Sequence, residues 1–141
     1  MQKKIGGQPH GNLKGLTKTE KYHDKKYNHT IYILSGLPKI EFEAVLAHEL
    51  LHIWLSENEQ QLISEKIEGF CNLGSSIIYE NDGTHFSKIH LQSMKNDSHP
   101  IYGDGYRYMK SQLEMLGWKK LIEQLVVTAR LSGPILDKID K

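Results

Sequence analysis

A long stretch of helical periodicity follows Pro38 and constrains the fold of this chain more than any other feature. Residues that would share one helix face recur there at intervals of three and four, and Trp54-Leu55 close the stretch. The recurring positions are Phe42, Val45, Leu46, Glu49, Leu50 and Ile53. The string His48-Glu49-Leu50-Leu51-His52 lies inside this predicted helix. Since residues four apart project from the same side of a helix, the two imidazoles can reach one point.

Two imidazoles at this spacing can bind one Zn²⁺ ion, with Zn–N bonds of about 2.0–2.1 Å. Glu49 is rotated by one residue, so it cannot share that coordination, but it can hold an activated water and take its proton. The alternative is a pair of ordinary helical histidines. The apolar residues that flank the motif favour the metal site, because an accidental His/Glu pair usually lies on a polar face. The sequence therefore predicts a metal centre with Glu49 as general base.

A third protein ligand is needed, and it does not come from an extension of the same motif. The longer form of the motif requires Gly at position 55 and His at position 58. This chain has Leu55 and Asn58 there, which excludes that class of metallopeptidase.

The next predicted helix, at about 62–79, offers Glu68 as the third ligand. Its neighbour Gly69 removes a side chain where we expect the two helices to pack. Glu65 is the rival, although an acid in the first turn of a helix is more often solvated. Asn72 lies one turn after Glu68 and can hydrogen-bond a ligand histidine.

The rest of the chain predicts a mainly α protein with a small β portion near the N-terminus. Strands are expected at 13–20 and 30–34, with a charged turn at 21–29 between them and a flexible segment at 1–12. A third helix is expected from the N-cap Thr84 to Met94, followed by a loop at 96–105. A fourth helix is expected at 106–116 and ends at Gly117. A fifth helix is expected to begin at Trp118 and to end at Ser132-Gly133-Pro134.

Composition narrows the class of protein. The 141 residues suit one domain, taken as 1–141. The net charge of +1 creates no positive electrostatic potential that would attract nucleic acid or an anionic membrane. The single cysteine, Cys71, excludes a disulfide framework and is expected to be a small buried residue. Neither a membrane span nor a secretory signal is visible. We therefore expect a soluble, cytoplasmic protein without nucleic-acid or membrane partners.

Five blocks of sequence carry a family resemblance. They are 34–39 (LSGLPK), 46–55 (LAHELLHIWL), 68–72 (EGFCN), 90–93 (HLQS) and 101–107 (IYGDGYR). In this order they resemble the peptidase domain of the plant organ-size LIM-domain peptidases, the "DA-one-like" group of zinc metallopeptidases. The last block is the most distinctive, and the resemblance spans roughly residues 9–130.

The resemblance implies an α+β, mainly helical, gluzincin-like fold, with a small N-terminal sheet and the HExxH active-site helix beneath it. It also implies that His48, His52 and Glu68 hold Zn²⁺ and that Glu49 is general base or acid. The plant members carry LIM modules and ubiquitin-interacting segments ahead of the peptidase, which this chain does not contain, so dependence on ubiquitin cannot be transferred. Asn72 stands where the plant proteins are expected to have Gln.

A peptidase also needs a hydrogen-bond donor for the negative charge that develops on the substrate carbonyl. The candidates are His90, Tyr102, Tyr106 and Arg107. The resembling family accepts Phe at position 106, which leaves Tyr102 and His90. Their structural alternatives are a turn anchor and an ordinary helix residue.

Three further side chains are less specific candidates for the site. Arg107 is expected to pair with Asp104 or with a carboxylate near the metal. His85 and His99 are possible additional ligands, but nothing in the sequence fixes their distance to His48.

The sequence thus predicts a zinc endopeptidase that acts on a protein or peptide substrate. The first alternative is a zinc-stabilised protein-interaction module whose peptidase activity is silent or depends on a partner. The second alternative is a metal-free helical interaction domain.

Overall fold

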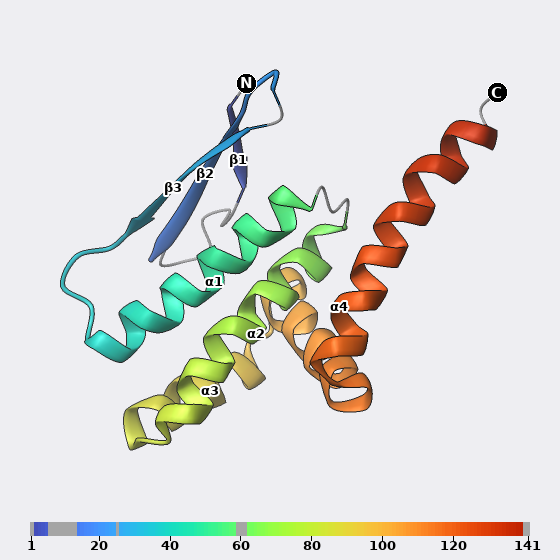
Figure 1. Ribbon diagram of the computed structural model, residues 1–141. Coiled ribbons are helices and arrows are strands. Elements are labelled where there is room, and N and C mark those ends of the chain that lie inside the picture. The colour runs from blue at the N-terminus through green and yellow to red at the C-terminus, as the bar shows by residue number, and fades with distance from the viewer. Residues whose placement is uncertain (1, 6–13, 25, 59–61, 140–141) are drawn as a thin grey trace.

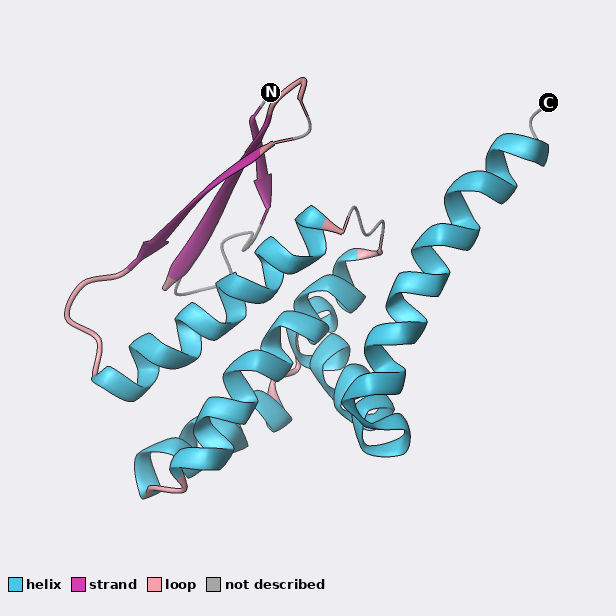
Figure 2. Ribbon diagram, viewed as in Figure 1, coloured by secondary structure: helices cyan, strands magenta, loops and turns pink. Residues whose placement is uncertain are grey.

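The computed structural model describes residues 2–5, 14–24, 26–58 and 62–139, with the backbone path alone for 2–5 and 127–139. It is mainly helical, with a small antiparallel sheet at the N-terminal end (Figures 1 and 2). The elements are β1 (Gln2–Ile5), β2 (Gly15–Lys21), β3 (Tyr27–Ile33), α1 (Lys39–Glu57), α2 (Ser64–Asp82), α3 (His85–Asn96), the π-helical turn η1 (Pro100–Asp104) and α4 (Gly105–Ile139). Within this part of the chain, no helix is both long and apolar enough to cross a membrane.

The sheet is an antiparallel meander in the order β1-β2-β3, and it lies along one side of α1 (Figure 1). Both predicted strands are confirmed, with β3 beginning at Tyr27 instead of Thr30. The predicted charged turn is therefore shorter than expected. Gln2–Ile5 pair with β2, where the sequence predicts a flexible segment, because an unpaired strand edge accepts any extended backbone beside it. The remainder of that segment, 6–12, lies outside the described residues.

Helix α1 lies between the sheet and α2, so it is covered on two sides. Its buried residues are Glu41, Ala44, Glu49, His52 and Leu55. Phe42 and Leu50, which the periodicity placed on the inner face, are 43% and 50% exposed. The buried part of this helix is thus largely polar. The apolar periodicity correctly predicted a helix here, but it did not predict which face of the helix is buried.

Two glycines of α2 allow close approach, but only one of them faces α1. A Cβ atom on Gly74 would lie 3.0 Å from the carbonyl oxygen of Ala47, and Ser75 Oγ donates to the carbonyl of Ala44 at 2.8 Å. A Cβ atom on Gly69 would instead collide with the backbone of Gly105 at the start of α4. The expectation that Gly69 serves the α1–α2 contact is therefore wrong, because it faces the other side of α2.

The apolar core lies between α1, α2 and α4. Its buried members are Leu55, Phe70, Cys71, Leu73, Tyr106, Met109, Leu121 and Leu125, and Trp54 and Trp118 pack against them. The chain reverses direction inside α4 at Gly117, whose φ of 79° favours glycine (Figure 1). The predicted break at Gly117 is confirmed. The predicted stop at Ser132-Gly133-Pro134 is wrong, since the helix continues to Ile139; a proline removes one helical hydrogen bond without always ending the helix.

The connection between α2 and α4 is more ordered than the sequence suggests. Thr84 caps α3, as predicted, with its side chain accepting from the amide of Ser87 at 3.2 Å. The predicted loop at 96–105 contains η1, whose first amides are capped by His99. Single π-helical turns are frequent at functional sites, which directs attention to the residues that η1 carries.

Candidate metal centre

Two histidines of α1 and one carboxylate of α2 meet at the interface between these helices. His48 Nε2 and His52 Nε2 lie 3.2 Å apart. Glu68 Oε2 is 3.2 Å from His48 Nε2, and Glu68 Oε1 is 3.3 Å from His52 Nε2. The Glu68 and His52 side chains are buried, and His48 is nearly so. The structure thus brings together the three residues that the sequence predicts as ligands.

The spacing of these atoms fits a small tetrahedral cation. Three ligand atoms that each bind zinc at about 2.0–2.1 Å in tetrahedral geometry lie about 3.3 Å from one another. The two Nε2 atoms lie 3.2 Å apart, which is close to this value, and each lies 3.2–3.3 Å from a different oxygen of Glu68, so the carboxylate lies within reach of the same point. Glu68 is also a buried carboxylate with an imidazole beside each oxygen, so its charge needs a positive partner there, either imidazolium protons or a bound cation. The donor set therefore suits Zn²⁺, although imidazole and carboxylate also bind other divalent ions.

Asn72 fixes the orientation of one ligand. His48 Nδ1 donates to Asn72 Oδ1 at 2.8 Å, so in the neutral imidazole the lone pair lies on Nε2, facing Glu68. His52 Nδ1 is buried and has no hydrogen-bond partner in the described part of the chain. The second imidazole contacts Glu68 and His48 through its Nε2 atom.

The charges in the cluster stabilise one another without a metal. Burial would raise the pKa of Glu68, but the hydrogen bonds and charges of His48 and His52 lower it to about 2. Burial would likewise lower the pKa of His48, but the nearby carboxylates of Glu68 and Glu49 raise it above its usual value. A divalent cation would take over the role of the imidazolium protons as the positive partner of Glu68.

Glu49 lies beside this cluster and is nearly inaccessible to solvent, with 3% of its surface exposed. Its Oε2 accepts a hydrogen bond of 2.6 Å from the hydroxyl of Thr17 on β2. This hydrogen bond holds the carboxylate between α1 and the sheet. Glu49 and Glu68 are therefore two carboxylates with different partners: the first is held by a hydroxyl and the second by imidazoles.

Tyr102 comes to the same region from η1. Burial raises the pKa of its hydroxyl, and the charges of Glu68 and Glu49 raise it further, so it remains a protonated donor at neutral pH. The ring of His99 contacts the ring of Tyr102 with centroids 4.9 Å apart. His99 Nδ1 also accepts from the amides of Ile101 and Tyr102. The sequence left His99 as a possible ligand; the structure shows it capping the turn that carries Tyr102.

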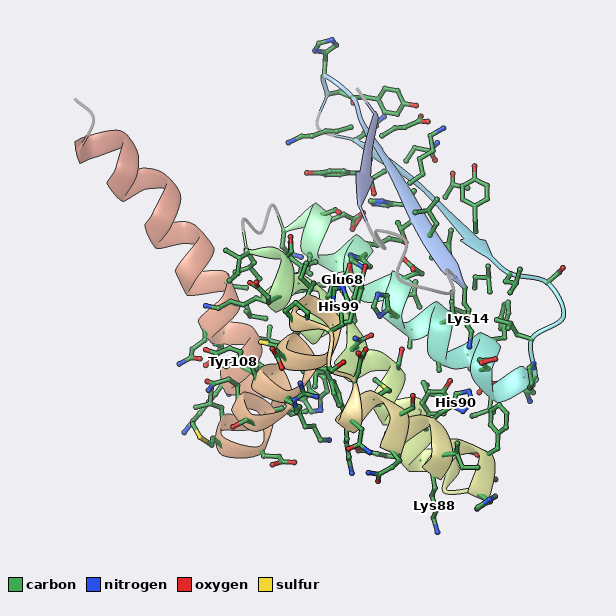
Figure 3. The ribbon with its side chains drawn as sticks, turned by 180° about the vertical axis from the view of Figure 1, so that it is seen from behind. Lys14, Glu68, Lys88, His90, His99 and Tyr108 are labelled. Carbon is green, nitrogen blue, oxygen red and sulfur yellow. The ribbon has the colours of Figure 1, made fainter. Side chains whose placement is uncertain are left out.

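The structure gives His90 a different set of partners. Its Nε2 lies 3.1 Å from Glu41 Oε2, and its ring contacts Tyr79 and Phe86. Glu41 precedes His48 by seven residues, which is about 10 Å along a helix. Figure 3 likewise shows His90 well apart from Glu68. The structure therefore does not bring His90 to the cluster, because α3 packs against α2 and places His90 beside Glu41, in the first turn of α1.

Three other candidates also lie elsewhere. Arg107 pairs with Asp104 and donates to the carbonyls of Lys95 and Asp97, so it closes the loop around η1 and does not reach a carboxylate of the cluster. Glu65 and His85 are exposed. In the distinctive block at 101–107, the contacts of Arg107 thus form a clasp, by which we mean that they fix the loop on which Tyr102 lies.

Cys71 is a neighbour of the cluster that sequence reasoning treated only as a core residue. Ligand atoms of His48, His52 and Cys71 all lie within 4.8 Å of one another. The thiol is fully buried, and burial together with the charges of Glu68 and Glu49 raises its pKa well above the usual value. Glu68 is the better third ligand, because its oxygens are already at coordination spacing. The signal for Cys71 was its position three residues after Glu68 on the same helix face.

Comparison with known proteins places this chain in a family. The profile of the DA1-like family, described as Protein DA1, matches residues 2–88, which is well over half of the chain and includes α1 and all of α2. The chain belongs to the DA1-like family. It is 26% identical over 132 residues to Protein DA1 of Arabidopsis thaliana, covering 71% of this chain and 24% of that protein. This DA1-like chain thus spans about a quarter of the length of the relative. No solved structure matches it.

The contact between Asn72 and His48 leads to a test of the metal centre. Asn72→Ala is expected to weaken zinc binding about 10- to 100-fold, because the His48 imidazole loses the acceptor that sets its orientation. Asn81→Ala, at an exposed position of the same helix, is the matched control and should leave the affinity unchanged. Competition with a chromophoric chelator measures both. Equal affinities of the two variants would mean that Asn72 does not support a metal ligand.

Proposed function

We propose that this DA1-like chain is a zinc-dependent endopeptidase of the gluzincin type, in which His48, His52 and Glu68 hold the metal. The observation that carries the proposal is the convergence of these three side chains at 3.2–3.3 Å. A fourth side chain, Glu49, lies beside them and supplies a second carboxylate, which is held separately by Thr17. An ordinary buried ion pair needs no such second carboxylate. The family membership supports the proposal, although the relative is about four times as long as the matched region.

The protein residues divide the work of hydrolysis. When bound, the metal would supply a Lewis acid that polarises the scissile carbonyl and makes water a nucleophile near neutral pH. Glu49 would take the proton of the attacking water and deliver it to the leaving amine. Since Glu49 is not a member of the ligand triad, its carboxylate is available for both transfers. Asn72 keeps the lone pair of His48 directed at the ligand position.

Tyr102 is the side chain best placed to stabilise the developing negative charge on the substrate carbonyl oxygen. Its hydroxyl stays protonated because two carboxylates oppose its ionisation. The loop that carries it is fixed by the His99 cap and by the Arg107 contacts with Asp104 and the carbonyl of Asp97. A donor that is already fixed costs no reorganisation when the charge develops. His90, the other sequence candidate, has no part in this proposal.

The proposed substrate is an extended protein or peptide segment in the cytoplasm. The chain has a net charge of +1, which favours neither acidic nor basic substrates. The proposal does not extend to regulation by ubiquitin, since the matched region is the only part shared with the relative.

The central test of the mechanism is Glu49→Gln. The variant should still bind zinc stoichiometrically, because the ligands are untouched, but it should lose about 10²- to 10⁴-fold in kcat/KM, since the amide cannot accept the proton. Chelator-sensitive cleavage of an unfolded protein measures activity, and elemental analysis measures zinc. Glu43→Gln, a surface change on the same helix, is the matched control. Undiminished cleavage by Glu49→Gln would exclude this mechanism.

A second candidate function is a zinc-stabilised interaction module, which Cys71 favours. Structural zinc sites have four protein ligands, whereas catalytic sites keep one position open. Because the thiol lies within 4.8 Å of both histidines, a modest shift would complete a closed set of His48, His52, Glu68 and Cys71. A closed site would bind zinc without hydrolysing peptides.

Cobalt substitution separates the open site from the closed one. A thiolate ligand gives Co²⁺ an intense charge-transfer band in the near ultraviolet, whereas nitrogen and oxygen ligands do not. We expect the Co²⁺-loaded protein to lack this band and to have the same spectrum after Cys71→Ala. A strong band that disappears in Cys71→Ala would favour the interaction module.

A further inference from the structure

Three carboxylates of α1 tie the helix to the sheet, and they recur every eight residues. Glu41 pairs with Lys14 at 2.9 Å, Glu49 accepts from Thr17 at 2.6 Å, and Glu57 lies 3.0 Å from His29 Nε2. The two outer contacts have solvent access, since the Lys14 and Glu57 side chains are 38% and 49% exposed. The middle contact is buried on both sides.

The middle contact differs from the others in chemistry as well as burial. Thr17 lies in the central strand, paired with Ile5 on one side and Ile31 on the other, and its side chain has no exposed surface. A valine would fill the same volume in the middle of a strand without burying a hydroxyl. The Thr17 hydroxyl is satisfied by Glu49, which indicates that the position serves the carboxylate as well as the packing.

Gly15 completes the frame around the same carboxylate. It lies two residues before Thr17 and therefore on the same face of β2. A Cβ atom at position 15 would lie 3.0 Å from Glu49 Oε1 and 2.5 Å from Val45 Cγ1. One oxygen of Glu49 is thus held by the Thr17 hydroxyl, and the other lies against the backbone of β2. The side chain has little freedom to rotate away.

We propose that Thr17 is a positioning residue for Glu49: its hydroxyl binds one carboxylate oxygen while the other lies against the backbone of Gly15, so the carboxylate is held in one rotamer. This inference rests on the proposed peptidase function. Glutamate loses considerable rotational freedom when it is fixed, and a general base must stay within about 0.5 Å of its working position. A short hydrogen bond from a rigid central strand supplies that constraint before substrate binds. It also makes catalysis depend on the docking of the sheet onto α1.

The test compares Thr17→Val with Thr17→Ser in the full chain. Thr17→Val keeps the shape and loses the hydroxyl, so kcat should fall about 10- to 100-fold while KM and zinc affinity stay within about twofold. Thr17→Ser keeps the hydroxyl and should restore most of the activity. Thr30→Val, at an exposed position of β3, is the matched control for the same substitution in the sheet.

A double variant shows whether Thr17 acts through Glu49. If it does, Thr17→Val combined with Glu49→Gln should be no slower than Glu49→Gln alone. An additional loss in the double variant, or a Thr17→Val protein as active as the parent, would overturn the proposal. If the parent protein itself cleaves no faster than Glu49→Gln, the peptidase function fails instead. A crystal structure of Thr17→Val then decides, since an unchanged Glu49 rotamer there would exclude the positioning role.

Discussion

The packing of α1 against α2 brings two imidazoles and one carboxylate to a single point, and the remaining features of the site depend on this contact. The helices approach closely where Gly74 faces the backbone of Ala47 and Ser75 bonds to the carbonyl of Ala44. That approach allows Glu68 to lie at 3.2–3.3 Å from both histidines. Asn72, one turn further along α2, orients His48 from the same surface. One helix pair thus supplies the ligands and their support.

The second constraint is the polar inner surface of α1. A helix that buries two carboxylates, Glu41 and Glu49, must satisfy both of them, and this one does so with Lys14, Thr17 and His90. The result links the small sheet directly to the candidate centre, because the carboxylate beside the histidines is also the one held by the central strand. The clasp around η1 completes the enclosure from the third side and fixes Tyr102. The sheet, α2 and η1 therefore all contribute side chains beside residues 48–52 of α1.

Much of this arrangement could be predicted from the sequence, and the failures have physical causes. The spacing of His48 and His52 follows from helix geometry, and Glu68 was preferred to Glu65 because an acid in the first turn of a helix is more often solvated and because the family resemblance implies Glu68. The ligand set could thus be named before the structure, although the packing argument from Gly69 was wrong. The inner face of α1 could not, because apolar periodicity assumes one buried side and this helix has two. Thr17 was missed because its role depends on a contact with a residue 32 positions away, and His99 was considered only as a ligand, whereas it caps the turn that follows it. His90 was a candidate on chemical grounds, but α3 places it beside Glu41.

Anomalous diffraction at the zinc edge, on crystals of the zinc-loaded chain, tests the central claim most directly. We expect one strong peak within about 2.0–2.1 Å of His48 Nε2, His52 Nε2 and a carboxylate oxygen of Glu68, with Glu49 outside the coordination sphere. A zinc peak at other residues, or a Glu68 carboxylate turned away from an occupied histidine pair, would contradict this account.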